Sequence, residues 1–244
     1  MFIVMTASSV DALKRAAAEA AASRIVSGMV VGLGTGSTAI HAVPALAQRL
    51  RSGELRDIRA VATSYQSTML ARELGIPLFD LDQIERIDLA IDGADEVAPD
   101  LTLIKGGGGA QTREKIIAAL AKDFTVVVDE AKLADRLGST RAVPVEVLAF
   151  AVGPVSRAIE RLGGQPELRM AVRKAGPVVT DQGNLLLDVR FTAIPDPASL
   201  ERDLKMIPGT LENGLFVGLT TRVLVASMDQ GVPKVREILP PRKS

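Results

Sequence analysis

Short apolar segments alternate with predicted helices from residue 9 to residue 128. The segment 9–27 is rich in alanine and predicts a helix, and further helices are predicted after Thr38, at 66–74 and at 113–122. The predicted strands between them cover residues 29–31, 58–63, 76–79, 87–91, 101–104 and 124–128. Strands that are apolar on both faces are typical of a parallel sheet buried between helices. The pattern predicts an α/β fold with a parallel, Rossmann-like sheet covered by helices.

The pattern changes after residue 141. A strand at 143–147, a helix at 154–162, a hairpin across 181–184 and a helix at 197–206 predict a smaller α+β domain of the split βαβ, ferredoxin-like type. The apolar segments 215–219 and 223–227 are expected to return to the first sheet. We therefore expect a catalytic domain of residues 1–141 and 216–244, and a lid or oligomerisation domain of residues 142–215.

The composition excludes several classes of function. The 29 basic and 29 acidic residues cancel, so no overall field attracts nucleic acid or an anionic membrane. The chain has no cysteine and one histidine, His41, which excludes a thiolate metal site and a histidine-rich metal centre. His41 is expected to pack or cap locally. No secretion leader and no run of 18 apolar residues is evident, so we expect a soluble cytoplasmic protein.

A glycine-rich turn, Gly32-Leu33-Gly34-Thr35-Gly36-Ser37-Thr38, lies between a predicted strand and a predicted helix. Its glycines allow close approach of the backbone to a ligand, and its hydroxyls and the amino end of the helix offer donors that suit a phosphate. The spacing fits neither the dinucleotide fingerprint nor the P-loop. The alternative is a turn without a ligand.

Three carboxylates follow the predicted strand 87–91, in Asp92-Gly93-Ala94-Asp95-Glu96. Carboxylates this close together raise one another's proton affinity unless a cation or sugar hydroxyls share the charge. Sugar binding with acid–base chemistry, a divalent metal and a solvated acidic turn are all compatible with the motif. Lys105, a possible counter-charge further along the chain, favours the sugar.

A second glycine run, Lys105-Gly106-Gly107-Gly108-Gly109, precedes the predicted helix opened by Thr112-Arg113-Glu114-Lys115. The lysine could hold a phosphate or an oxyanion. Glu114 lies near the amino end of the helix, where a carboxylate tends to stay ionised, a fair state for a proton acceptor. Acidic residues are also common in first helical turns for purely structural reasons.

Together these motifs, in this order, resemble the type A ribose-5-phosphate isomerase family. The resemblance extends to Thr63-Ser64, Thr68, Lys132 and Val143-Pro144-Val145-Glu146-Val147. It implies isomerisation of ribose 5-phosphate and ribulose 5-phosphate in the non-oxidative pentose phosphate pathway. It further implies that the enzyme needs no metal or organic cofactor, takes a small sugar phosphate rather than nucleic acid or membrane as its partner, and is a homodimer or homotetramer.

The resemblance also assigns residues. It places the proton acceptor on Glu114. As the mechanism, we expect Lys105 and a nearby aspartate to stabilise charge on the two substrate oxygens, and Asp92 or Asp95 to shuttle the hydroxyl proton and assist opening of the sugar ring. The substrate-binding residues are Thr35, Gly36, Ser37, Thr38, Asp92, Gly93, Ala94, Asp95, Lys105, Gly106, Gly107, Gly108, Lys132 and Lys14. Gly109 and Gln111 depart from the family pattern, which more often has alanine and an apolar residue there. A sugar-phosphate deaminase, a coenzyme A transferase-like enzyme and a non-catalytic sugar-phosphate sensor remain alternatives.

Overall fold

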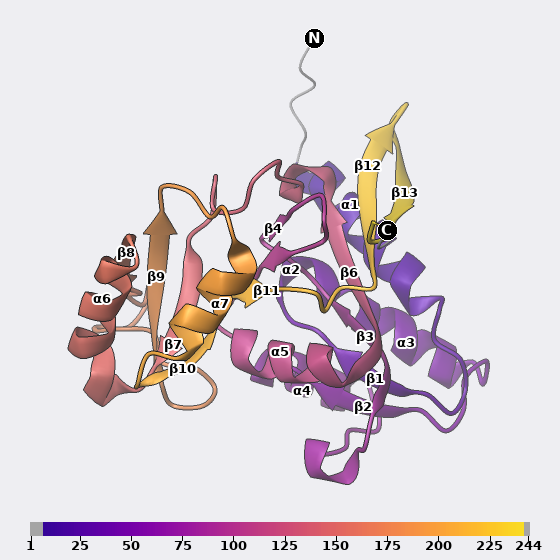
Figure 1. The fold of residues 1–244 in the computed structure, drawn as a ribbon. Helices are drawn as coiled ribbons and strands as arrows, with labels where there is room; N and C mark the ends of the chain where they lie inside the picture. The colour runs from indigo at the N-terminus through magenta and orange to yellow at the C-terminus, as the bar shows by residue number, and fades with distance from the viewer. Residues whose placement is uncertain (1–6, 242–244) are drawn as a thin grey trace. The chain divides into compact units, whose positions relative to one another are not determined.

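A computed structural model describes residues 7–241, which divide into two compact units (Figure 1). The first unit takes its described residues from Met1–Gly93, Ile116–Lys132 and Thr220–Ser244. The second consists of Ala94–Lys115 and Leu133–Leu219. Within residues 7–241 no helix is long and apolar enough to cross a bilayer.

The first unit contains a six-stranded sheet in the order β13-β12-β6-β3-β1-β2. Its strands are β1 (Val30–Leu33), β2 (Arg59–Ala62), β3 (Ile87–Asp92), β6 (Ala121–Asp129), β12 (Arg222–Asp229) and β13 (Val232–Ile238). Neighbouring strands are parallel except for β12 and β13. The predicted parallel α/β sheet is therefore confirmed, and the segment 223–227 joins it as predicted. We did not predict β13, a partly exposed edge strand whose charged residues give no apolar run.

Helices of the first unit cover this sheet. They are α1 (Ala7–Ala22), α2 (Gly36–Ala39), α3 (Ala42–Arg51), α4 (Tyr65–Glu73) and the last half of α5 (Gln111–Leu120). The small side chains of α1 pack against β6 and β12 and share one apolar core with α3. On β1, a Cβ at Gly32 would lie 2.6 Å from Ile117 of α5, so glycine allows this close packing.

Two local predictions in this unit were wrong. The single helix expected after Thr38 is interrupted at Ile40 and His41, which separate α2 from α3. Segment 76–79 forms only an isolated bridge between Leu78 and Ala60 rather than a strand.

The order of the strands reverses around β1. The chain passes from β1 to β2 on one side and then returns to β3 on the other side of β1. In open parallel sheets, ligands bind beside the carboxyl ends of the strands at such a reversal. The loop after β1 and the end of β3, which carry two of the predicted motifs, therefore lie at this point of the sheet.

The second unit contains an antiparallel sheet in the order β10-β7-β9-β8. Its strands are β7 (Val143–Val147), β8 (Gly164–Leu168), β9 (Leu185–Phe191) and β10 (Thr210–Asn213), with helices α6 (Val152–Arg161) and α7 (Pro197–Lys205). The chain order strand, helix, strand, strand, helix, strand is that of the predicted ferredoxin-like type. β9 pairs with β7 and with β8, a polar strand that we did not predict, and 178–180 contributes only the bridge of Val179 to Leu185.

A small sheet in the order β11-β5-β4 completes the second unit. It pairs β4 (Glu96–Val97) and β11 (Leu215–Phe216) with β5 (Leu103–Ile104). The segment 215–219 was expected in the first sheet, but β11 pairs here instead. The predicted domain boundaries placed 94–115 and 133–141 with the first domain, whereas these segments belong to the second compact unit.

Candidate active site

In the first unit, the loop Gly34–Thr38 lies against the end of β3. The amide of Gly34 donates to the carbonyl of Ile91 over 2.9 Å, and the amide of Thr35 donates to Asp92 Oδ1 over 3.1 Å. A Cβ on Gly34 would lie 2.6 Å from the Cα of Asp92, so this approach requires glycine. The structure thus brings together the loop that the sequence predicts to bind phosphate and Asp92, another predicted site residue.

Hydroxyl groups from the end of β2 line the same loop. The Thr35 hydroxyl lies 2.6 Å from the hydroxyls of both Thr63 and Ser64. The amide of Gly36 donates to Gln66 Oε1 over 3.0 Å. Thr63 and Ser64 are not among the predicted site residues. They follow β2, the strand beside β1, and this position at the carboxyl end of a strand could have predicted that they lie near the loop.

Three other polar side chains of the first unit were singled out from the sequence. Lys132 is partly buried in a short helix, Glu130–Lys132, that follows β6, the strand beside β3. Lys14 is partly buried on α1. His41 Nε2 lies 3.4 Å from Asp11 Oδ1 on α1, which agrees with the local role expected for it.

The second unit contains a buried ion pair. Lys105 Nζ lies 3.2 Å from Glu114 Oε2, and the two side chains are only 3% and 6% exposed. Glu114 belongs to the first turn of α5, and Lys105 directly follows β5. The Lys105 ammonium also lies 5.4 Å from the centre of the Phe216 ring, a favourable distance for a cation–π contact. The predicted base and the predicted cation therefore contact each other.

The glycine loop, Gly106–Gly109, follows Lys105 and contacts Asp95. The amide of Gly107 donates to Asp95 Oδ2 over 2.7 Å. The amide of Asp95 donates to Ile104 of β5, which fixes the acidic turn beside the start of the loop. Asp95, Lys105 and the glycine loop therefore form one group in this unit, together with Glu114.

The third carboxylate of the acidic motif has a structural role. Glu96 is buried and accepts hydrogen bonds from the amides of Gly138, Thr140 and Arg141 at 2.7, 2.7 and 2.8 Å. A carboxylate that accepts several amide protons stabilises the loop that donates them. Glu96 therefore holds the 138–141 turn, and it is not among the predicted site residues.

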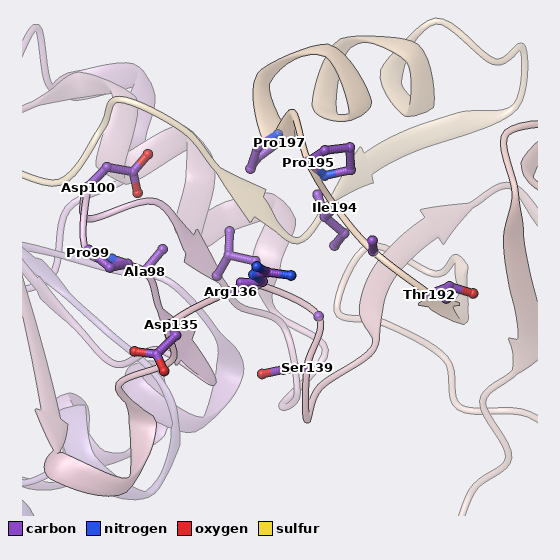
Figure 2. Close-up of a pocket in the computed structure, with 13 residues that line it drawn as sticks. Ala98, Pro99, Asp100, Asp135, Arg136, Ser139, Thr192, Ile194, Pro195 and Pro197 are labelled. Atoms are coloured by element: carbon purple, nitrogen blue, oxygen red, sulfur yellow. The ribbon is translucent and has the colours of Figure 1, made fainter.

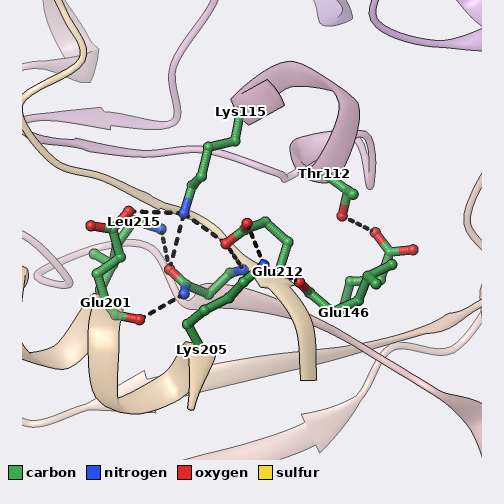
Figure 3. A network of polar contacts seen from close by, with 9 residues as sticks. Thr112, Lys115, Glu146, Glu201, Lys205, Glu212 and Leu215 are labelled. Atoms are coloured by element: carbon green, nitrogen blue, oxygen red, sulfur yellow. Dashed lines mark hydrogen bonds and ion pairs between the residues drawn. The ribbon is translucent and has the colours of Figure 1, made fainter. Parts of the chain in front are cut away.

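A second buried carboxylate, Glu146 on β7, supports the start of α5. It accepts hydrogen bonds from the hydroxyl of Thr112, from the hydroxyl of Thr180 over 2.7 Å and from Asn184 Nδ2 over 2.9 Å (Figure 3 shows the Thr112 contact). Thr112 lies two residues before Glu114 on α5. Both oxygens of this carboxylate are hydrogen-bonded, by Thr112 and by the turn 180–184, and the carboxylate so fixes the first turn of the helix that carries the predicted base.

Lys115, the next residue of α5, is held by two glutamates. Its ammonium lies 2.9 Å from both Glu201 Oε1 and Glu212 Oε1 (Figure 3). Burial would raise the pKa of the Glu212 carboxyl, but the charge of Lys115 and the hydrogen bonds from Lys205 and the Asn213 amide outweigh it and lower that pKa below its ordinary value. The native state therefore favours the ionised form of Glu212.

This lowered pKa predicts an effect of pH on stability. The contribution of Glu212 is present at pH values above the ordinary pKa of a glutamate, and it is lost as the pH falls through the lower pKa of the folded protein. We expect Glu212→Gln to lower the free energy of unfolding at pH 7 by about 1–3 kcal/mol, and to differ little from wild type in acid. Urea unfolding at both pH values measures this, with the exposed Glu160→Gln as control. An equal loss at both pH values would contradict the prediction.

The side chain of Gln111, at the start of α5, is buried. Its side-chain amide is inaccessible, and neither its oxygen nor its nitrogen has a hydrogen-bond partner among the described residues. Burying an unpaired amide is unfavourable. We expect Gln111→Met, which keeps the shape, to raise the free energy of unfolding by about 1–2 kcal/mol. Urea unfolding tests this beside Gln48→Met on the exposed side of α3, and a less stable Gln111→Met would refute it.

A pocket of about 510 Å³ lies elsewhere in the second unit (Figure 2). It is lined by residues of the segments 98–100, 135–139 and 192–197. None of the predicted site residues lines it, so the cavity does not mark the predicted site. In the described part of the chain, no three histidine, aspartate or glutamate side chains are grouped so that they could hold a metal ion.

Comparison with known proteins identifies the family. The family model described as ribose 5-phosphate isomerase A (phosphoriboisomerase A) matches residues 59–230. Ribose-5-phosphate isomerase A of Thermosynechococcus vestitus is 58% identical over 234 residues, which cover 96% of this chain and 99% of the relative. The chain belongs to the ribose 5-phosphate isomerase A family. The resemblance inferred from the ordered motifs is thereby confirmed.

Solved members of the ribose 5-phosphate isomerase A family share this fold. The enzyme from Methanocaldococcus jannaschii is 43% identical with a TM-score of 0.87, and the match covers 93% of this chain and 98% of that one. A D-ribose-5-phosphate isomerase in complex with phospho-erythronic acid is 44% identical with a TM-score of 0.89, covering 94% and 99%. These matches confirm the predicted α/β fold with a smaller additional domain.

Proposed function

We propose that this chain interconverts D-ribose 5-phosphate and D-ribulose 5-phosphate through an enediolate intermediate. The observation that carries the proposal is the buried Lys105–Glu114 ion pair beside the glycine loop, in a chain that belongs to the ribose 5-phosphate isomerase A family. The phospho-erythronic acid bound to a solved relative supports it, because the planar carboxylate of such an acid resembles the two oxygens of an enediolate.

Glu114 is the proposed base. An aldose becomes a ketose when a proton leaves C2, beside the C1 carbonyl, and a proton is returned to C1. One carboxylate can perform both transfers. The nearby Lys105 ammonium favours the ionised form of Glu114, which is the form that accepts a proton. General-base catalysis of this kind contributes about 10²–10⁴-fold to a rate.

Lys105 and the two aspartates are proposed to act on the substrate oxygens. The ammonium of Lys105 stabilises the negative charge that develops on the enediolate. Asp95, which the amide of Gly107 orients, and Asp92, which the amide of Thr35 orients, are the candidates for moving the hydroxyl proton and for assisting ring opening. Ala94, Gly106 and Gly108 are proposed as neighbouring substrate contacts.

The phosphate group is proposed to bind at the loop Thr35–Thr38. Its hydroxyls, and the amides that begin a helix, are suitable donors for an oxyanion. Gly93, Lys132 and Lys14 complete the proposed binding residues, and the two lysines supply positive charge. Binding of this remote group orients the sugar for reaction and leaves the chemistry to Glu114.

Isomerisation in heavy water tests the function. Purified protein, treated with a chelator, is incubated with ribose 5-phosphate in D₂O, and the products are followed by NMR. We expect ribulose 5-phosphate with deuterium at carbon 1, because the base exchanges its proton with solvent between the two transfers. Failure to form ketose would refute the proposal and would favour a deaminase, a coenzyme A transferase-like enzyme or a sugar-phosphate sensor.

We also propose that the chain forms a homodimer or homotetramer in the cytoplasm. Three large apolar side chains of the second unit support self-association: Leu148, Phe150 and Met206 are 49%, 99% and 78% exposed. Their segments are adjacent, because the amide of Leu148 donates to the carbonyl of Gly209. Contiguous exposed apolar patches mark association surfaces, and these adjacent segments can supply such a patch. Light scattering of the purified chain measures the mass.

A further inference from the structure

Arg169 is held rigidly at the end of β8. Its amide donates to the carbonyl of Leu186 on β9 over 2.9 Å, and its carbonyl accepts from the amide of Val178 over 2.9 Å. The backbone of Arg169 is therefore bonded on both sides and extends the antiparallel sheet. These two backbone hydrogen bonds fix the position from which the Arg169 side chain extends.

The guanidinium of Arg169 connects the sheet with the glycine loop. Nε donates to Asp188 Oδ2 on β9 over 2.8 Å, and Nη2 donates to Asp188 Oδ1, so the pair is bidentate. Nη1 donates to the carbonyls of Gly106 and Gly107 over 3.1 and 3.2 Å. The planar fork of arginine makes all four bonds in one orientation, which a lysine cannot do.

The glycine loop needs such a support. Gly106 and Gly109 have φ values of +100° and +78°, and Gly107 is exposed. Fixing the backbone of a residue costs about 1–2 kcal/mol of conformational entropy, and glycine loses more freedom than other residues. A Cβ on Gly109 would lie 3.1 Å from Leu186, so the loop rests on the same sheet that carries Arg169.

The backbone of Gly107 is held by two hydrogen bonds. Its amide donates to Asp95, and its carbonyl accepts from Arg169. The loop follows directly from Lys105, whose side chain is paired with Glu114. A change in the loop therefore alters the positions of Asp95 and Lys105 together.

We propose that Arg169 is a positioning residue of the isomerase, which fixes the glycine loop so that Lys105 and Asp95 take their reactive positions. The antiparallel sheet of the second unit thereby supports the reaction through Arg169 and Asp188. This inference rests on the proposed function.

Steady-state kinetics of arginine variants test the proposal. Arg169→Gln is compared with Arg190→Gln, which removes an exposed arginine from β9. Because a small displacement of reacting groups can cost about 10²-fold in rate, we expect Arg169→Gln to lower kcat by about tenfold to a hundredfold. KM should change by less than about threefold, since the loss concerns the transition state. Arg169→Lys should fall between Arg169→Gln and wild type.

Chemical rescue separates positioning from simple destabilisation. Arg169→Ala leaves a space for guanidinium, and we expect added guanidinium chloride, below unfolding concentrations, to restore part of kcat, whereas sodium chloride of equal ionic strength should not. Circular dichroism measures the folded fraction throughout. Two results would overturn the role of Arg169. One is a kcat of Arg169→Gln within about twofold of that of Arg190→Gln. The other is a loss of activity that the unfolded fraction explains and that guanidinium does not restore. An inactive wild-type chain would instead refute the proposed function itself.

Discussion

Glu114→Gln is expected to lower kcat by at least about 10²–10⁴-fold while the protein continues to bind ribose 5-phosphate. Glutamine keeps the shape of the side chain and can still accept a hydrogen bond from Lys105, but its amide cannot take a proton from carbon. The loss should therefore appear in kcat, and the dissociation constant should remain within about tenfold of wild type. Coupled spectrophotometric assays and titration calorimetry measure the two quantities.

The control for this variant is Glu130→Gln. Glu130 is also an acidic residue in the first turn of a helix, but it is exposed. It should therefore retain wild-type kcat. If Glu114→Gln turned over substrate at a rate similar to Glu130→Gln, Glu114 could not be the base. Loss of substrate binding together with kcat would point instead to a disturbed site.

Lys105→Met is expected to be both inactive and unstable. Methionine has a side chain of similar length, but it leaves the Glu114 carboxylate buried without the Lys105 ammonium. Removing one partner of a buried ion pair typically costs about 3–5 kcal/mol. The missing ammonium also removes the proposed stabilisation of the enediolate, for which a loss of about 10²–10³-fold in kcat is typical. Urea unfolding at pH 7 and the isomerase assay measure the two effects.

A double variant distinguishes these two effects. Lys105→Met combined with Glu114→Gln removes both charges, so a large part of the lost stability should return while the activity stays absent. The coupling energy follows from the four proteins of the cycle. If the double variant were as unstable as the sum of the single variants predicts, the ion pair would contribute nothing and the stability of this part of the fold would have another origin.

The positions of the loops could be predicted from sequence because strand ends determine them. The motifs at Gly34 and Asp92 each follow an apolar strand, and the carboxyl ends of parallel strands meet at one edge of a sheet, so their contact was implied by the pattern. The same reasoning could not find β8 or β13. These strands lie at the edges of their sheets and are polar, so no apolar run in the sequence predicts them.

The supporting residues could not be predicted because their partners are distant along the chain. Glu146 contacts Thr112, and Arg169 contacts Gly106, across 34 and 63 residues. Such contacts exist only after the antiparallel sheet has formed, and nothing near either residue in sequence indicates its partner. The placement of 94–115 in the second unit has the same origin, because β5 pairs there with β11.

Two lysine ammonium groups lie near the ring of Phe216. Nζ of Lys105 is 5.4 Å from the centre of the ring, and Nζ of Lys115 is 5.1 Å from it. Since the chain contains no tryptophan, a Phe216→Trp substitution would introduce a single indole fluorophore at this buried position. Its emission wavelength responds to nearby charge, so the spectrum would report directly on changes in the electric field around Lys105 as substrate arrives. The fluorescence of Phe216→Trp would therefore report on the charges beside the proposed reactive groups.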